Sequence, residues 1–287
     1  MPTRVIKVIA DDYHRIYDSL LRDLNPNFTK ERWEPLFHWG WDNPEDHIGY
    51  ALETDSGDLV GFLATIYSLQ QFGKLERVIV CNVSSWVVIP GYRSSALALV
   101  MPVLRRRDVT VTNLTSLPEV NTMFRKLGFA TLETHTCVLL PRPKPFSVRA
   151  GGECLRIDPA KAESFGDTGA VRTIRDHRLV EQQWILRLDG VSCHVVLTLG
   201  RRRRLRTARI HHVSDPKIFR EVIWGLRSKL LKAHGVLLCE WDERLLGGLE
   251  IHGTRRVPLP VPRIFRSDQI KAKDLSNLYS ELPLLKL

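Results

Sequence analysis

The sequence predicts an α/β (α+β) fold, in which a mixed central sheet is flanked by helices and is followed in tandem by a second, similar domain. Three observations lead to this prediction. Strand and helix patterns alternate over residues 1–140, a proline-rich segment follows, and the order strand, strand, helix, strand occurs on both sides of that segment. The length of 287 residues also suits about two domains.

Hydrophobic periodicity and turn residues place the elements of the first half. Strands are expected at residues 4–9, 49–53, 59–67, 78–89, 109–113, 130–133 and 136–140, and helices at 12–24, 30–37, 94–106 and 119–127. Gly128 ends the last of these helices, since glycine favours the position after a helix C-terminus. Pro102 has no amide N–H, so the helix of residues 94–106 is expected to kink or end near Met101.

A linker is expected at residues 141–145, where the sequence Pro-Arg-Pro-Lys-Pro alternates proline with cations. This pattern excludes a helix and favours an extended polyproline II spacer. The predicted division is therefore a first domain at residues 1–140, a linker at 141–150 and a second domain at 151–287.

The clearest pattern in the second half is at residues 191–199, where apolar and polar side chains alternate as in a half-buried strand. Residues 201–204 are then a hairpin turn, and 205–213 return as the partner strand. Asp215, which precedes a proline, caps a helix, and residues 236–241 form the next strand.

The net charge of +10 is concentrated in the second half, because residues 151–287 contain 25 Lys and Arg against 16 Asp and Glu. A domain with this excess attracts an anion. The partners considered are nucleic acid, an anionic lipid surface, an acidic protein such as an acyl carrier protein, and a phosphorylated substrate.

Cysteine spacing and hydropathy exclude several other classes. The five cysteines are odd in number and form no CxxC pair, so neither a disulfide framework nor a metal site is expected. No apolar run reaches the roughly 18 to 20 residues of a membrane span. The first residues lack the apolar core of a secretory signal, and a cytoplasmic location is expected.

The most informative stretch runs from Trp86 to Ala98. A β-branched strand ends at Pro90, a tight turn follows, and a helix opens on the small residues 94–96. A helix N-terminus presents free amides and about half a positive charge, which suits a pyrophosphate. Arg93 adds a full charge and hydrogen-bond donors. The alternative is an ordinary strand-to-helix turn without a ligand.

This stretch resembles the phosphate-binding turn of the GNAT superfamily of acyl-CoA N-acyltransferases. In that family a strand leads into an Arg/Gln-x-x-Gly-x-Gly/Ala loop, and residues 93–98 here read Arg-Ser-Ser-Ala-Leu-Ala, with alanine at both glycine positions. Residues 124–129, Phe-Arg-Lys-Leu-Gly-Phe, resemble the family's Tyr-x-x-Leu-Gly-Phe. The resemblance covers about residues 4–140, and the second half is interpreted as a degenerate copy without cofactor binding.

The resemblance implies that residues 86–88 part from the strand of residues 109–113, and that the gap holds the pantetheine arm of acetyl-CoA or another acyl-CoA. An acyl carrier protein thioester is the other donor considered. An amine of a small molecule or peptide would attack the thioester directly, and amides near residues 87 and 88 would stabilise the oxyanion. The cofactor-binding residues implied are Trp86, Val87, Val88, Arg93, Ser94, Ser95, Ala96, Leu97, Ala98, Asn113 and Phe124.

Both acid–base positions depart from the family pattern. The tyrosine that serves as general acid falls on Phe124, and the glutamate that serves as general base in several members falls on Asn82. Phenylalanine has no proton to give, and asparagine cannot act as a base. Asn82 can orient a water, so the expected catalytic residues are Asn82 with the hydroxyls of Ser84 and Ser85, and the Tyr67 hydroxyl can join this relay.

The acceptor is expected near residues 37–41, where the family's variable acceptor-binding region lies. His38 can act as a base beside the aromatic walls of Trp39 and Trp41, and Tyr67 completes this group of candidate substrate-binding residues. The alternative is that these aromatics pack the core.

The sequence therefore predicts an N-acyltransferase, with a catalytically silent protein of the same fold as the alternative. The silent protein would bind an anionic partner, an acyl carrier protein or nucleic acid, through its basic second half. Residues 201–206 are the densest basic run, but they contain no aromatics, so nucleic acid is the less favoured partner. A solvated hairpin tip is the simplest interpretation of this run.

Overall fold

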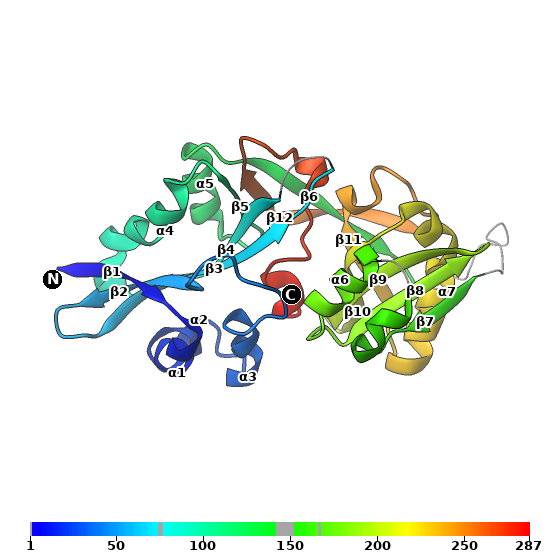
Figure 1. The fold of residues 1–287 in the computed structure, drawn as a ribbon, viewed down its shortest axis with the longest axis horizontal. Coiled ribbons are helices and arrows are strands. Elements are labelled where there is room, and N and C mark those ends of the chain that lie inside the picture. The colour runs from blue at the N-terminus through cyan, green and yellow to red at the C-terminus, as the bar shows by residue number, and fades with distance from the viewer. Residues whose placement is uncertain (1, 74–76, 142–151, 166–167) are drawn as a thin grey trace. The chain divides into compact units, whose positions relative to one another are not determined.

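The computed structural model describes residues 2–73, 77–141, 152–165 and 168–287, and most of the expected linker, residues 142–150, lies outside them. The chain forms two compact units (Figure 1). Unit 1 comprises Met1–Leu132, Arg263–Leu275 and Tyr279–Leu285, and unit 2 comprises Glu133–Pro262, Ser276–Leu278 and Lys286–Leu287. Segments near the C-terminus thus belong to unit 1, whereas the sequence analysis expected two contiguous domains.

Unit 1 contains a mixed sheet, as predicted. Its strands, in spatial order, are β1 (Thr3–Val8), β2 (Gly49–Thr54), β3 (Leu59–Gln70), β4 (Val78–Val88), β5 (Val109–Asn113) and the C-terminal part of β12 (Thr254–Arg266). Neighbours pair antiparallel except β4 and β5, which are parallel. A parallel pair requires a crossover connection, and α4 (Ala96–Leu104) provides it.

The helices of unit 1 cover both faces of this sheet (Figure 1). Its helices are α1 (Tyr13–Ile16), α2 (Arg22–Leu24), α3 (Lys30–Trp33), α4, α5 (Pro118–Lys126) and α8 (Glu281–Leu284), and a π-helical turn (Tyr17–Leu21) joins α1 to α2. On one face, Val103 of α4 and Phe124 of α5 are buried against Leu63. On the other face, Phe37 stacks on Phe62, with ring centroids 5.8 Å apart.

Pro102 lies inside α4, so of the two expected effects, a kink or an end near Met101, the helix does not show the end. The amide of Arg105 still donates to the Met101 carbonyl at 3.0 Å, so the helical hydrogen bonds resume beyond the proline. Burial of Leu99, Val100 and Val103 stabilises the helix on both sides of Pro102, because tertiary packing contributes more to helix stability than local propensity.

The strands of unit 2 also pair in a mixed pattern. Its strands, in spatial order, are β12, β6 (Ala130–Leu139), β11 (Leu238–Asp242), β10 (Leu205–Val213), β9 (Val191–Arg202), β8 (Gln182–Leu188) and β7 (Glu153–Arg156). Its helices are α6 (Thr168–Asp176) and α7 (Pro216–His234). β6 is one strand where the sequence analysis expected two, because Thr134 and His135 continue its extended backbone.

Helix α7 packs on one face of this sheet and begins as the sequence predicts. The Asp215 carboxylate accepts hydrogen bonds from the amides of Lys217 and Ile218, and Gly235 ends the helix with a φ of 65°. Phe219 of α7 packs against Trp241 of β11. Because α7 joins the parallel strands β10 and β11, the order of elements resembles β4, α4 and β5, but the duplicated fold stays a prediction.

Among the residues described, no helix combines the length and apolarity that a membrane crossing requires.

Candidate functional site

The strands β4 and β5 part in the middle of unit 1. Their parallel pairing runs from Ile79 opposite Val109 to Asn82 opposite Thr112. β4 then continues for six residues to Val88, while its pairing with β5 ends. In the described part of the chain no strand pairs with this edge of β4 beyond Asn82, and an unpaired strand edge is the kind of surface that bonds an extended ligand.

A β-bulge lies in β4 just beyond this point. Ser84 pairs with Ala64 and Val87 pairs with Phe62, so two residues of β4 oppose one residue of β3. Ser85, in the bulge, has a φ of 49°, a left-handed conformation that costs a non-glycine residue about 1–3 kcal/mol. Bulges and strained residues of this kind gather at ligand sites, because they re-aim backbone and side-chain groups.

The turn after β4 is open to solvent. A 3₁₀ helix (Pro90–Ser95) precedes α4, so the regular helix begins two residues later than expected. The side chains of Arg93 and Ser94 are exposed, and a Cβ atom added at Gly91 would meet no atom within 4 Å. The turn is therefore not covered by other described side chains. An anion-binding turn must be uncovered in this way.

The Asn82 side chain links β4, β5 and the C-terminal helix α8. It is fully buried, its Nδ2 donates to Thr112 Oγ1 at 3.2 Å, and its Oδ1 accepts from the Glu281 amide at 3.3 Å. Asn82 thus contacts protein groups directly on both of its side-chain polar atoms, and its contact with a water stays a prediction. Ser84 Oγ lies 3.4 Å from Ser85 Oγ, and neither hydroxyl takes part in the hydrogen bonds of Asn82 given above.

Glu281 is the residue of this site that the sequence analysis missed. Its side chain is fully buried, and Oε1 accepts a hydrogen bond from Thr115 Oγ1 at 2.7 Å. Oε2 is buried and has no hydrogen-bond partner in the described part of the chain. Burial raises the pKa of this carboxyl to about 7, although the bond from Thr115 opposes the shift. A carboxylate with such a pKa is matched to general-base catalysis near neutral pH.

Helix α8 is fixed in unit 1 by apolar and polar contacts. Ser280 Oγ caps it by accepting from the Leu282 amide at 3.2 Å, and Leu282 and Leu285 are buried. Arg32 donates to the Leu285 carbonyl at 2.9 Å. These contacts hold Glu281 beside the parted strands.

Solved structures share the overall fold of this chain. A GCN5-related N-acetyltransferase from Anabaena variabilis ATCC 29413 matches 92% of this chain and 72% of its own, at 12% identity and a TM-score of 0.63. One from Kribbella flavida covers 93% and 71%, at 11% identity and a TM-score of 0.55. Eis1 from Mycobacterium abscessus covers 93% and 73%, at 14% identity and a TM-score of 0.54. The chain has the GCN5-related N-acetyltransferase fold.

The GNAT fold that the sequence resemblance implied is therefore confirmed. Neither the models of known families nor the curated proteins give a match to this sequence.

Two of the expected acceptor residues lie close to α8 within this GNAT fold. Trp41 Nε1 donates to the Tyr67 carbonyl at 2.8 Å, and the Trp41 ring stacks on Trp39. Tyr279, two residues before Glu281, packs edge-on against Trp41, with ring centroids 5.1 Å apart. Trp41 is mostly buried, as the core-packing alternative expected, while Trp39 is partly exposed.

Three other expected residues are placed differently by the GNAT fold. His38 lines a surface pocket with Tyr13 and Lys30, and no β4 residue lines that pocket. Tyr67 is fully buried, and burial raises the pKa of its hydroxyl far above the ordinary value, which removes it from a proton relay. Phe124 is fully buried and packs edge-on against Trp86, so it has no surface to offer a cofactor.

Proposed function

We propose that this chain is an N-acyltransferase that moves an acyl group from acyl-coenzyme A to an amine. The observation that carries the proposal is the parting of β4 from β5 after Asn82, next to the bulge at Ser85. The gap suits an extended pantetheine arm, because a strand edge without a partner bonds an extended chain through its backbone groups. The GNAT fold of the structural neighbours supports the same reaction class, as an analogy.

The remaining cofactor contacts follow from the direction of β4. Beyond Val88 the chain enters the exposed turn that holds Arg93, and α4 follows. We assign the pyrophosphate to Arg93 and residues 94–98, and the pantetheine arm to the edge of residues 86–88 with Asn113 opposite. The Trp86 indole N–H is buried and has no acceptor among the described residues, so a ligand carbonyl would satisfy a donor that is otherwise costly to bury.

Glu281 supplies the base that the sequence motif lacks. In the proposed reaction the amine nitrogen bonds to the thioester carbonyl carbon, the carbon–sulfur bond breaks, and Glu281 takes the proton that the nitrogen releases. The thiolate leaves with the bonding electrons and is protonated by water, which a thiol with a pKa of about 8.5 permits. Amides near Val87 would stabilise the oxyanion. Asn82 and Thr115 position the glutamate.

The second candidate is a catalytically silent protein of the same fold. It rests on the substitution of the family's acid and base by Phe124 and Asn82. Glu281 weakens this argument, because its buried carboxyl has a raised pKa and its backbone amide donates to Asn82 Oδ1. The anionic partner that this candidate requires is compatible with an active enzyme as well.

Titration calorimetry with coenzyme A, acetyl-CoA and longer acyl-CoAs tests the proposal. We expect binding of at least one thioester, and loss of most of that binding in the Arg93→Glu variant, because the substitution places a negative charge beside the pyrophosphate. The matched control is Arg105→Glu, which reverses an exposed charge at the other end of α4. Absence of binding by any thioester and by coenzyme A would contradict the proposal, as would equal losses in the two variants.

A further inference from the structure

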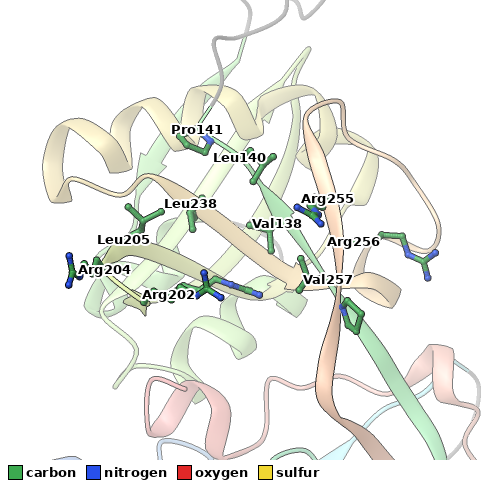
Figure 2. A pocket seen from close by; sticks show the side chains of 12 residues that line it. Val138, Leu140, Pro141, Arg202, Arg204, Leu205, Leu238, Arg255, Arg256 and Val257 are labelled. Atoms are coloured by element: carbon green, nitrogen blue, oxygen red, sulfur yellow. The ribbon is translucent and has the colours of Figure 1, made fainter.

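A groove with a volume of about 770 Å³ lies in unit 2 (Figure 2). It is lined by seven apolar residues and by five arginines, which are Arg202, Arg203, Arg204, Arg255 and Arg256. Figure 2 shows Arg202 and Arg204 on one side of it and Arg255 and Arg256 on the other. No acidic residue lines this arginine groove among the residues described.

The positive charge of the arginine groove is only partly neutralised. Arg202 forms an ion pair with Glu240 at 2.7 Å, but Glu240 also pairs with Arg209, so one carboxylate serves two guanidinium groups. Arg256 pairs with Glu243 at 2.6 Å. Like charges held this close repel one another, and a bound anion would relieve the repulsion.

Three arginines of the groove remain free to bind an anion. Arg203, Arg204 and Arg255 are exposed and form no ion pair or side-chain hydrogen bond in the part of the chain that the structure describes. A guanidinium carries five N–H donors in a planar fork that suits carboxylates and phosphates. The groove therefore offers donors on both of its sides.

The hairpin between β9 and β10 uses arginine where the backbone favours a smaller residue. Arg202 pairs with Leu205, which leaves a two-residue turn of Arg203 and Arg204. Arg203 has a φ of 55°, and turns of this length favour glycine, asparagine or aspartate at such positions. The backbone of this turn therefore gains nothing from arginine at position 203.

The apolar floor of the groove belongs to the sheet face opposite α7. Leu139 and Cys239 pack in the core beneath α7, and side chains alternate along a strand, so Val138 and Leu238 point to the opposite face. Leu205 adds an exposed leucine at the edge of this floor. The floor is aliphatic and contains no aromatic ring, which disfavours nucleic acid, because single strands bind by stacking bases on aromatics.

We infer that the arginine groove is a docking site for an acidic, amphipathic segment of a partner protein, with its apolar side chains on the Leu205–Leu238 floor and its carboxylates at Arg203, Arg204 and Arg255. Charge complementarity selects the acidic partner, and the aliphatic floor selects an amphipathic one. This inference is independent of the proposed acyl-CoA site, because every residue that lines the groove belongs to unit 2.

Fluorescence anisotropy tests the inference. The probe is a fluorescein-labelled peptide made of glutamates and leucines, with the leucines spaced three and four residues apart so that they share one helix face. We expect saturable binding to the full-length chain that weakens as salt is raised. The double variant Arg203→Glu, Arg255→Glu should weaken it at least about tenfold. The control is Arg187→Glu, Lys232→Glu, which makes the same change in net charge at exposed sites of unit 2 outside the groove, and should change the affinity less than about twofold.

A Leu205→Asn variant separates the apolar contact from charge. It should weaken binding of the leucine-containing peptide severalfold and leave the binding of a polyglutamate of equal charge unchanged. The inference is overturned if the peptide does not bind, or if both double variants weaken it equally. It is also overturned if a single-stranded oligonucleotide or phosphatidylserine vesicles compete for the groove more strongly than the peptide does.

Discussion

The backbone amide of Glu281 donates a hydrogen bond to Asn82 Oδ1, with an N···O distance of 3.3 Å and a separation of 199 positions in the sequence. The same asparagine bonds Thr112, the last residue of β5 that pairs with β4. The C-terminal helix α8 is thereby attached where the two parallel strands part. The family resemblance implies a carboxylate at position 82, where this sequence has an asparagine. The carboxylate of Glu281 lies next to that position instead.

Glu281→Gln should lower kcat by about 10²- to 10⁴-fold, the range for removal of a general base. Glutamine keeps the size of the side chain, so the dissociation constant of acyl-CoA should stay within a few-fold of the wild-type value. Steady-state release of coenzyme A thiol, with an amine that the wild type acylates, measures the first quantity, and calorimetry measures the second. A variant that retains wild-type kcat would remove Glu281 from the reaction.

The pH profile of the wild type should report the same group. Because a base must be deprotonated to act, kcat should rise with pH through an inflection at about 7, the pKa to which burial raises Glu281. The inflection should be absent in Glu281→Gln. An unchanged inflection in that variant would assign it to another group.

Asn82→Asp should move this inflection to higher pH. An added carboxylate beside Glu281 disfavours the charged form of the glutamate, so its pKa rises further. The control is Asn121→Asp, since Asn121 is also a buried asparagine of unit 1 but bonds Ser116 and Arg125. A purely structural role for Asn82 predicts a lower kcat with the inflection unchanged, and that outcome would oppose the positioning role.

Glu281 should also make stability depend on pH. The folded chain holds the pKa of this carboxyl at about 7, above the 4.5 of a free glutamate, so folding favours its protonated form. Its contribution to stability is full below about pH 4.5 and is lost as pH rises through about 7. At pH 8, Glu281→Gln should therefore unfold at a higher urea concentration than the wild type. A lower midpoint for the variant at this pH would contradict the buried, raised-pKa carboxyl.

Local sequence features predicted those parts of the fold that depend on neighbouring residues. The strand 109–113 and the Asp215 cap were correct, because periodicity and capping act over a few residues. The parted strands followed from a motif of a few residues at Arg93 together with the family resemblance. The helix continues past Met101 because burial of Val103 and Leu104 overrides the local effect of Pro102.

The rest depends on contacts between segments far apart in the sequence. β12 pairs Ile264 with Asn113, and no local pattern indicates which strand edge a proline-containing segment joins. Glu281 has no motif around it. The one signal in the sequence is an acid between Ser280 and a run of leucines, which indicates a capped helix end with a carboxyl in apolar surroundings.

The bulge residue Ser85 gives a test of the site's backbone. Ser85→Val should lower the free energy of unfolding by about 1–2 kcal/mol, because a β-branched residue is strained at a φ of 49°. Ser85→Gly should keep or raise the stability, since glycine adopts this conformation without strain. Urea unfolding measures both. Equal stability of the two variants would show that the left-handed conformation is not required at this position.

The last prediction concerns the buried histidine His194 of unit 2. Its Nε2 donates to Gln183 Oε1 at 3.1 Å, and Nδ1 is buried without a partner in the described part of the chain. Burial lowers the pKa of His194 to about 3, with further lowering from His212 and His177. Because the unfolded chain binds a proton near pH 6.5, stability is full above that pH and is lost as pH falls toward about 3. Between pH 7 and 5 this amounts to about 2 kcal/mol.

His194→Gln should therefore flatten the dependence of the unfolding free energy on pH in this range, although His212 retains part of the slope because burial lowers its pKa as well. The matched control is His252→Gln, an exposed histidine of the same unit, which should keep the wild-type slope. Urea midpoints at pH 7, 6 and 5 measure the three slopes. A slope in His194→Gln as steep as in the control would mean that this imidazole is protonated in the folded chain.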